Sequence, residues 1–196
     1  PLATVDDGSC IYTCTAAPYM ENFDLGTGTW TNNGWTLDAA GTTSGSTGPS
    51  DDMTGGGNYM YFETSFPVVV GDQVTMTSEC LDVSALANPC LTFYYHMYGA
   101  SMGTLEVLVN DSVEWSMSGD QGDVWTLASV DLSAYAGSNV TIAFVGTAAT
   151  IPGGTTVYWG DMAIDNIEVN ECGAVTIMGC TDPLANNYDP AANTDD

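Results

Sequence analysis

The charge of this chain constrains its fold more than any other sequence feature. Its 196 residues include 25 Asp or Glu and no Lys or Arg, so the formal net charge at pH 7 is −25. No carboxylate can pair with a Lys or Arg of the same chain, and repulsion among the carboxylates opposes compaction. Salt, protonation or bound cations must offset that repulsion. The charge also excludes nucleic acid and anionic membrane surfaces as partners, since nothing in the chain neutralises phosphates.

The region from about residue 15 to 171 has the pattern of a β-protein. Short apolar stretches such as QVTMTSE, GTLEVLV and NVTIAFVG alternate with turn-rich stretches such as AAGTTSGSTGPSDD. In LTFYYHMYG the odd-numbered residues from 91 to 97 would face one side of a sheet and the even-numbered residues the other. We therefore expect an antiparallel sandwich or barrel. No apolar run is long enough for membrane insertion.

The two ends of the chain match each other. PLATVDDGSC at the start aligns with PAANTDD at the end, with Pro1 on Pro190 and Asp6 on Asp195. Both ends are rich in Asp, Asn and Pro and have too little apolar content to fold alone. We interpret residues 1–13 and 173–196 as two halves of a connector in a tandem array, with a folded domain over 14–172 between them. The chain also opens without a signal peptide, so it reads as a segment of something longer.

The six cysteines indicate disulfides and an oxidising compartment. Their spacing contains no C-x-x-C pair, and the one histidine, His96, lies in a strand pattern, which speaks against zinc. The Asp residues sit mostly in turns, where short carboxylates can form oxygen cages for calcium. The alternative for scattered Asp residues is a solvated acidic surface.

The central region resembles a MAM domain, an extracellular adhesion module named after meprin, A5 antigen and receptor phosphatase mu. The matching stretches, in chain order, are ENFD, GTWTNNGWTL, STGPSDDMTGGGNYMYFE, CLTFYYHMYGASMGTLEVLV, WSMSGDQGDVWTLASVDLSAYAG, VTIAFVGT and GDMAIDNIEV. The ends resemble the GCTD…NYDP…DDGSC connectors of large secreted surface proteins of Bacteroidota, which are similar to calcium-binding thrombospondin type 3 repeats. The resemblance implies an all-β jelly roll of two antiparallel sheets, adhesion or assembly, and no catalysis.

The MAM resemblance also implies a structural cation near the start of the fold. Matched by motif, its ligands would be Asp24, Asp52 and Asp165, and carboxylates from distant parts of the sequence suit calcium. Asp165 is also the odd residue in MAIDNIEV, a strand otherwise apolar enough to be buried, and a buried carboxylate with no Lys or Arg available needs a metal or several backbone donors. For Asp24 and Asp52 the alternative is a turn or cap.

The cysteines depart from the family, because the usual early pair is missing and Cys80 and Cys14 are added. We favour Cys80–Cys90 and Cys14–Cys172, and the family pairing Cys90–Cys172 is the alternative. Cys180 of one unit would pair with the equivalent of Cys10 in the next. That connector would bind calcium through side chains from both units, namely Asp182, Asn187, Asp189 and Asp195 on one side and Asp6 and Asp7 on the other.

Nothing in the sequence indicates catalysis. A nucleophilic triad needs a base held by a third group, and His96 sits between Tyr95 and Met97 in a strand pattern. The predicted function is a non-enzymatic, extracellular bead of a calcium-stabilised adhesin or filament, with neighbouring copies as partners and surface glycans or proteins as further ones. The alternative is a carbohydrate-binding jelly roll, whose binding rings would come from the five tryptophans, Trp30, Trp35, Trp115, Trp125 and Trp159.

Overall fold

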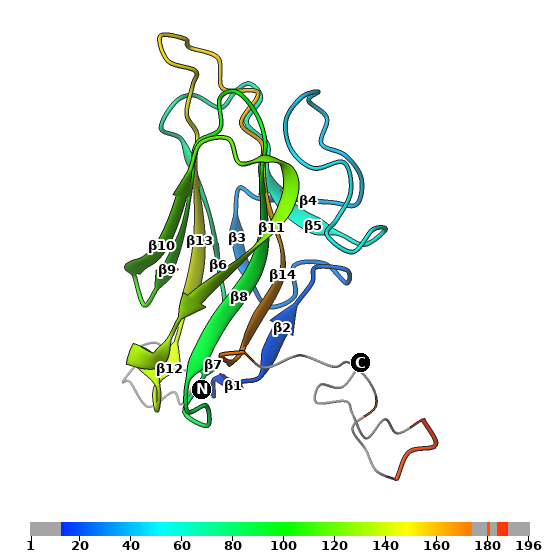
Figure 1. The fold of residues 1–196 in the computed structure, drawn as a ribbon, viewed down its shortest axis with the longest axis vertical. Coiled ribbons are helices and arrows are strands. Elements are labelled where there is room, and N and C mark those ends of the chain that lie inside the picture. The colour runs from blue at the N-terminus through cyan, green and yellow to red at the C-terminus, as the bar shows by residue number, and fades with distance from the viewer. Residues whose placement is uncertain (1–12, 174–179, 181–183, 188–196) are drawn as a thin grey trace, which may run out of the picture.

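The computed structural model describes residues 13–173, 180 and 184–187. Two antiparallel sheets pack face to face, and a small third sheet lies at one end of this sandwich (Figure 1). The expected all-β antiparallel sandwich is confirmed. One pair is an exception, since β1 and β7 run parallel. Within the described ranges no helix has the length and apolar character needed to cross a bilayer.

The three sheets are built as follows. The larger sheet has the order β11-β8-β14-β5-β4, with β2 also paired to β14; its strands are β2 (Tyr19–Glu21), β4 (Thr36–Asp38), β5 (Tyr59–Phe62), β8 (Pro89–Met97), β11 (Gly122–Asp131) and β14 (Met162–Glu171). The second has the order β10-β9-β13-β6-β3, from β3 (Thr31–Asn33), β6 (Gln73–Thr77), β9 (Thr104–Val109), β10 (Ser112–Ser118) and β13 (Ile142–Thr147). The end sheet contains β1 (Thr15–Ala16), β7 (Leu81–Asp82) and β12 (Asn139–Val140), and a 3-10 turn, η1, spans Ser133–Tyr135.

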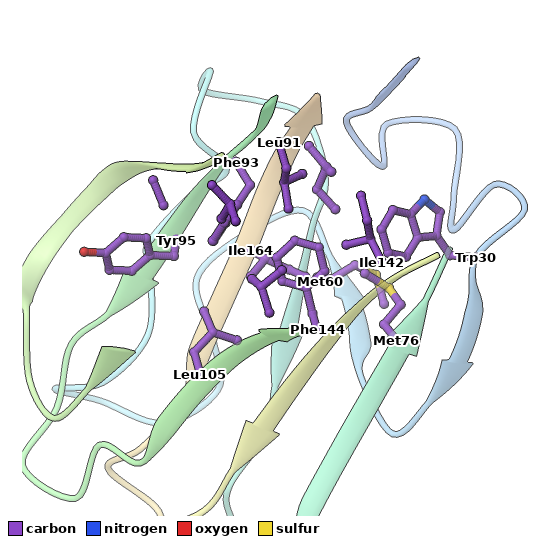
Figure 2. Packing of buried hydrophobic residues seen from close by; sticks show 14 of the residues in the cluster. Trp30, Met60, Met76, Leu91, Phe93, Tyr95, Leu105, Ile142, Phe144 and Ile164 are labelled. Atoms are coloured by element: carbon purple, nitrogen blue, oxygen red, sulfur yellow. The ribbon is translucent and has the colours of Figure 1, made fainter. Parts of the chain in front are cut away.

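The core lies between the two larger sheets and is built by alternation along the strands (Figure 2). In β9 every second residue is buried, and in β13 the same holds. Aromatic rings meet edge-on at the centre, where the Phe93 and Phe144 centroids are 4.9 Å apart. Trp30 is also buried there, and its indole N–H donates to the Tyr19 hydroxyl at 2.7 Å.

A second, smaller apolar cluster lies apart from this core. Tyr59, Tyr61 and Ala163 are buried, and Trp125 packs against them. The long connection between β4 and β5, residues 39–58, bonds to this cluster at two points. The Trp125 indole N–H donates to the carbonyl of Asp51 at 3.1 Å, and the Tyr59 hydroxyl donates to the carbonyl of Ala40. These contacts hold the connection against β11 and β5, and the N–H of Met53, which donates to Asp165 Oδ2 at 3.1 Å, joins it to β14.

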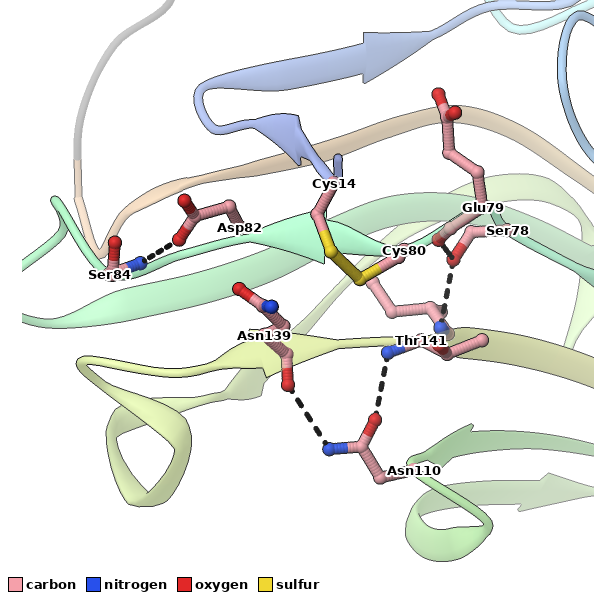
Figure 3. The surroundings of a disulfide bond; sticks show 10 residues. Cys14, Ser78, Glu79, Cys80, Asp82, Ser84, Asn110, Asn139 and Thr141 are labelled. Atoms are coloured by element: carbon pink, nitrogen blue, oxygen red, sulfur yellow. Dashed lines mark hydrogen bonds between the residues drawn. A yellow bond between two sulfur atoms is a disulfide. The ribbon is translucent and has the colours of Figure 1, made fainter. Parts of the chain in front are cut away.

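The disulfides are Cys14–Cys80 and Cys90–Cys172, with Cα–Cα distances of 4.7 and 5.0 Å. The favoured pairings Cys80–Cys90 and Cys14–Cys172 are therefore wrong, and the family pairing Cys90–Cys172 is present. The cause is strand pairing: the N–H of Thr15 donates to the carbonyl of Cys80 at 2.9 Å, which brings Cys14 beside Cys80 (Figure 3). Cys90 in turn lies opposite Asn170 in the β8–β14 ladder, next to Cys172.

The predicted connectors fall largely outside the described residues. Asp6, Asp7, Cys10, Asp182, Asp189 and Asp195 all lie outside them. Asn187 is described and is exposed in a turn. Cys180 is also described and forms no disulfide with the described residues. The calcium connector and its intermolecular disulfide therefore stay predictions.

One buried carboxylate belongs to the fold itself. Asp161 is fully buried, and its Oδ1 accepts hydrogen bonds from the N–H and the hydroxyl of Thr64 at 2.9 and 3.0 Å. Its Oδ2 has no partner among the described residues. Burial, reinforced by the charge of Glu63, raises the pKa of Asp161 from 3.8 to about 6 against the Thr64 hydrogen bonds, which lower it. The ionised form therefore weakens the fold.

The disulfide assignment can be tested by mapping. Because trypsin has no site in the chain and Asp82 lies between Cys80 and Cys90, a non-reduced digest with a protease that cleaves before Asp should yield one pair of peptides joined through Cys14–Cys80 and another pair joined through Cys90–Cys172. Replacing either pair by serine should lower the free energy of unfolding by about 2–4 kcal/mol in denaturant titrations, because each bridge closes a long loop of the unfolded chain. A peptide joining Cys80 to Cys90 would contradict the structure.

The pKa of Asp161 predicts a specific pH dependence. Since its folded pKa lies above 3.8, its contribution to stability is complete below pH 4 and is lost as the pH rises through about 6. Asp161→Asn keeps an acceptor for Thr64 and removes the charge. We expect the variant to exceed the parent in unfolding free energy by up to about 3 kcal/mol at pH 7 and by little at pH 4. An equal difference at both pH values would show that the carboxylate charge is not the cause.

Candidate metal site

Asp165 is the most buried acidic residue of the predicted cation site. It lies in β14, opposite Tyr94 of β8, and only 1% of its surface is exposed. The ladder shifts register just after it, and Asn166 has a positive φ of 45°. This bulge points the Asn166 N–H at Asp165 Oδ1, 2.7 Å away, while Oδ2 accepts the N–H of Met53 at 3.1 Å. The Asp165 carboxylate is thus held in place from two sides, by a backbone N–H of the bulge and by a backbone N–H of the β4–β5 connection.

The electrostatics of Asp165 depend on the other two predicted ligands. Burial raises its pKa to about 7, the N–H groups of Met53 and Asn166 lower it, and the charges of Asp52 and Asp24 raise it further. The structure therefore brings Asp24, Asp52 and Asp165 near enough to repel one another. A divalent cation would relieve that repulsion and release the proton that Asp165 holds near neutral pH.

Asp24 and Asp52 meet at Gly57. A Cβ at Gly57 would lie 2.2 Å from Asp24 Oδ1 and 2.9 Å from Asp52 Oδ2, so only glycine allows both carboxylates this close to the backbone. Asp24 also accepts the N–H of Asn58 at 2.8 Å. It follows the fully buried Phe23, which adopts a positive φ of 61° and turns the chain outward. Asp24 lines two open clefts, of about 340 and 540 Å³.

Asp52 is buried, and one of its two carboxylate oxygens has hydrogen-bond partners while the other has none among the described residues. Oδ2 accepts the N–H of Thr54 at 3.0 Å and also its hydroxyl, whereas Oδ1 has no partner among the described residues. Burial raises the pKa of Asp52, but hydrogen bonds from Thr54, Gly57 and Gly56 outweigh it and lower the pKa to about 2. This carboxylate is therefore charged at all physiological pH values.

The donor set suits calcium, because it consists of carboxylate oxygens from three distant segments of the chain. The unpartnered Asp52 Oδ1 and the glycine cradle at Gly57 fit a cation. Within the part of the chain that the structure describes, however, no three His, Cys, Asp or Glu side chains already have the arrangement of a metal cluster. Binding would have to draw the carboxylates together, and calcium there stays a proposal.

Sequence reasoning missed the groups that hold these carboxylates. Gly57, the N–H of Met53 and the N–H of Asn58 were not predicted. The run of three glycines that begins three residues after Asp52 was the available signal, since glycine permits close approach of a charged group to the backbone. The contact between His96 Nε2 and Asp123 Oδ1, at 3.1 Å, was also missed, and no local pattern announces it.

The tryptophans considered for sugar binding do not form one exposed surface. Trp30 and Trp35 are buried, Trp115 packs on Phe93 and Tyr95, and Trp125 packs on Tyr59 and His96. Trp159 lies with its ring centroid 4.3 Å from that of Tyr158, which is exposed. This last pair is the part of the tryptophan set that could present rings to a ligand.

Comparison with known proteins agrees with this fold. The human MAM domain-containing glycosylphosphatidylinositol anchor protein 1 is 35% identical over 175 residues, which cover 85% of this chain and 16% of that protein. Zebrafish neuropilin-1a is 29% identical over 161 residues, 76% of this chain and 16% of that protein. The chain thus spans about a sixth of the length of these relatives.

A solved structure has the same architecture at low sequence identity. The K1 cleaved adhesin domain of Lys-gingipain from Porphyromonas gingivalis W83 superposes with a TM-score of 0.54 at 18% identity, covering 78% of this chain and 97% of that one. The sequence profile of the family described as "MAM domain, meprin/A5/mu" matches residues 22–173, which include Asp24, Asp52 and Asp165. This chain belongs to the MAM domain family.

Proposed function

We propose that this chain is a non-enzymatic extracellular adhesion module and one repeating bead of a calcium-stabilised adhesin or filament. The observation that carries the proposal is the MAM match over residues 22–173, which includes every strand from β3 to β14. The two ends of the sequence match each other, which supports a tandem repeat whose neighbouring copies are the partners. The relatives named as glycosylphosphatidylinositol-anchored proteins support a cell-surface setting, and so do two disulfides.

Calcium would serve two purposes in this proposal. Held by Asp24, Asp52 and Asp165, it would supply positive charge to carboxylates that have no Lys or Arg to pair with. It would also join the connection between β4 and β5 to β14, because Asp52 and Asp165 come from these two elements. In the connectors, calcium would order segments that have little apolar content of their own.

The environment of His96 supports a role without catalysis. Its Nε2 faces Asp123 Oδ1 rather than a hydroxyl or thiol nucleophile, and burial lowers its pKa while Asp123 raises it. A hydrolytic triad needs a nucleophile on one side of the imidazole in addition to the carboxylate on the other.

Carbohydrate binding is the second candidate function. The adjacent rings of Tyr158 and Trp159 favour it, since exposed rings beside polar groups can stack on a sugar. Both rings lie in the irregular segment between β13 and β14, and the remaining tryptophans are engaged elsewhere.

The calcium proposal predicts a stabilisation that Asp165 controls. At about 100 times the dissociation constant, calcium should raise the free energy of unfolding of the wild-type protein by roughly 2.7 kcal/mol. Asp165→Asn should abolish that gain. In chelator at pH 7.5 the variant loses a charge that weakens the metal-free fold, but its amide accepts only one of the two N–H groups that Asp165 accepts. We therefore expect its unfolding free energy to stay within about 2 kcal/mol of the wild-type value.

Asp111→Asn is the matched control. It removes the same charge in the exposed β9–β10 turn and should respond to calcium like the wild type. Thermal or denaturant unfolding with calcium and with chelator gives both comparisons. A full calcium response in Asp165→Asn would eliminate the site at Asp24, Asp52 and Asp165.

The array proposal predicts what microscopy of the native material should show. Electron micrographs should contain regular strings of beads, each about 40 Å across by the size scaling of compact domains. Chelator should make the strings irregular, because the connectors lose the cation that orders them while the sandwich keeps its core. Dispersed single particles would reject the array and leave glycan binding as the better function.

A further inference from the structure

The larger sheet has an open border along β11 (Figure 1). β11 pairs with β8 on one side, and no strand among the described residues pairs with its other side. An edge strand of this kind presents a row of backbone N–H and C=O groups that can pair with another chain. The function proposed above makes no use of this edge.

The pairing register shows which backbone groups of β11 face outward. The N–H of Leu132 donates to the carbonyl of Pro89 at 2.9 Å, and two residues earlier Val130 lies opposite Leu91. Backbone groups of an antiparallel strand point alternately to its two sides, so every second residue of β11 faces away from β8. These outward-facing residues are Leu127, Ser129 and Asp131, and all three are exposed.

The other sheet borders are protected by features that this part of β11 lacks. β1, β2, β3, β4 and β12 contain only two or three residues each, and β10 has a register shift between Val113 and Trp115. Very short strands and bulges both hinder pairing at an edge. The register shift of β11 lies before Thr126, so residues 126–131 form a regular stretch, and it contains no proline. Among the sheet borders that the structure describes, β11 therefore offers the longest regular edge.

The charge of the chain determines which partner fits this edge. A strand from a second copy would bring no Lys or Arg, and two molecules with a net charge of −25 repel each other. The edge carries Asp131, and Asp123, whose side chain is 65% exposed, lies near the start of β11. Glu114 of β10 lies close to the other end of β11, because it accepts the hydroxyl of Tyr135 at 2.6 Å. The edge is therefore complementary to positive charge.

We propose that the edge of β11 binds an extended, basic segment of a different protein, which adds a strand to the larger sheet. Backbone hydrogen bonds would supply affinity, and alternate side chains would supply specificity. On the inner face, apolar side chains of the added strand would continue the surface of Ala128 and Val130, which belong to the core. On the outer face, Lys or Arg would lie beside Asp131. The partner is thus a segment in which apolar and basic residues alternate.

Hydrogen exchange of the full chain, kept in calcium, tests this proposal. The probe is a capped peptide of about eight residues in which Lys and Val alternate, long enough to cover the regular stretch of β11. Without peptide, the amides of Leu127, Ser129 and Asp131 should exchange faster than those of Ala128 and Val130 in NMR spectra of ¹⁵N-labelled protein. Excess peptide should slow the first three by about 10-fold or more. Unchanged exchange with the peptide in excess would overturn the proposal.

Two control peptides separate strand addition from general attraction to an acidic protein. With Glu in place of Lys, the peptide should give no protection, because it is repelled. With Gly in place of Val, the charge stays the same but the strand propensity falls, so the three amides should again stay unprotected. Equal protection by the Lys–Gly peptide would assign the effect to charge alone and reject strand addition, and equal protection by the Glu peptide would reject a basic partner.

Variants of Ser129 distinguish backbone pairing from side-chain contact. Ser129→Pro removes one outward-facing N–H and leaves the ladder with β8 intact, so it should weaken binding of the Lys–Val peptide about 5-fold in calorimetric titrations. Ser129→Ala keeps the N–H and should bind like the wild type, and so should Asp111→Asn. Equal affinity in Ser129→Pro and the wild type would contradict the proposal. If Ser129→Pro does not fold, the exchange measurement on the wild type decides.

Discussion

In a chain without Lys or Arg, every buried carboxylate depends on backbone N–H groups and hydroxyls. The structure uses such bonds to fasten loops to strands. Glu171 at the end of β14 accepts the N–H groups of Ala87 and Asn88, the latter at 2.9 Å. Glu21 at the end of β2 accepts the N–H of Phe23 at 2.8 Å, which shapes the turn that presents Asp24. The acidic residues are therefore part of the architecture.

This dependence divides the molecule into two kinds of region. Between the sheets, apolar side chains such as Phe93 and Phe144 supply the stability, and charge plays no part. Around the β4–β5 connection, acidic groups lie buried or half-buried close together, and burial together with the charges of Asp52 and Asp24 raises the pKa of Asp165. The stability of the second region depends on pH and on cations, whereas that of the first depends on packing.

The two regions also differ in how far the sequence predicted them. Period-2 alternation predicted the strands well, because burial on one face imposes it directly, as in β9 and β13. Resemblance to the family placed Asp24, Asp52 and Asp165 in one neighbourhood, although composition alone could not distinguish them from the other Asp residues. The pairing of Cys14 with Cys80 was missed, because the parallel contact between β1 and β7 is made of only two residues each and leaves no periodic signal. The His96–Asp123 contact joins residues 27 apart across an irregular ladder, and spacing does not reveal it.

The two disulfides have a consequence for how tension would pass through the domain. A force applied to the two ends acts on Cys14 and Cys172. The disulfides transmit it to Cys80 and Cys90, which are close neighbours in the sequence. Only the short segment between them then bears the load, and its fully extended length is about 35 Å, whereas the chain from Cys14 to Cys172 would reach roughly 550 Å when fully extended. The disulfides therefore keep the force off most of the domain, and the sandwich stays folded under tension.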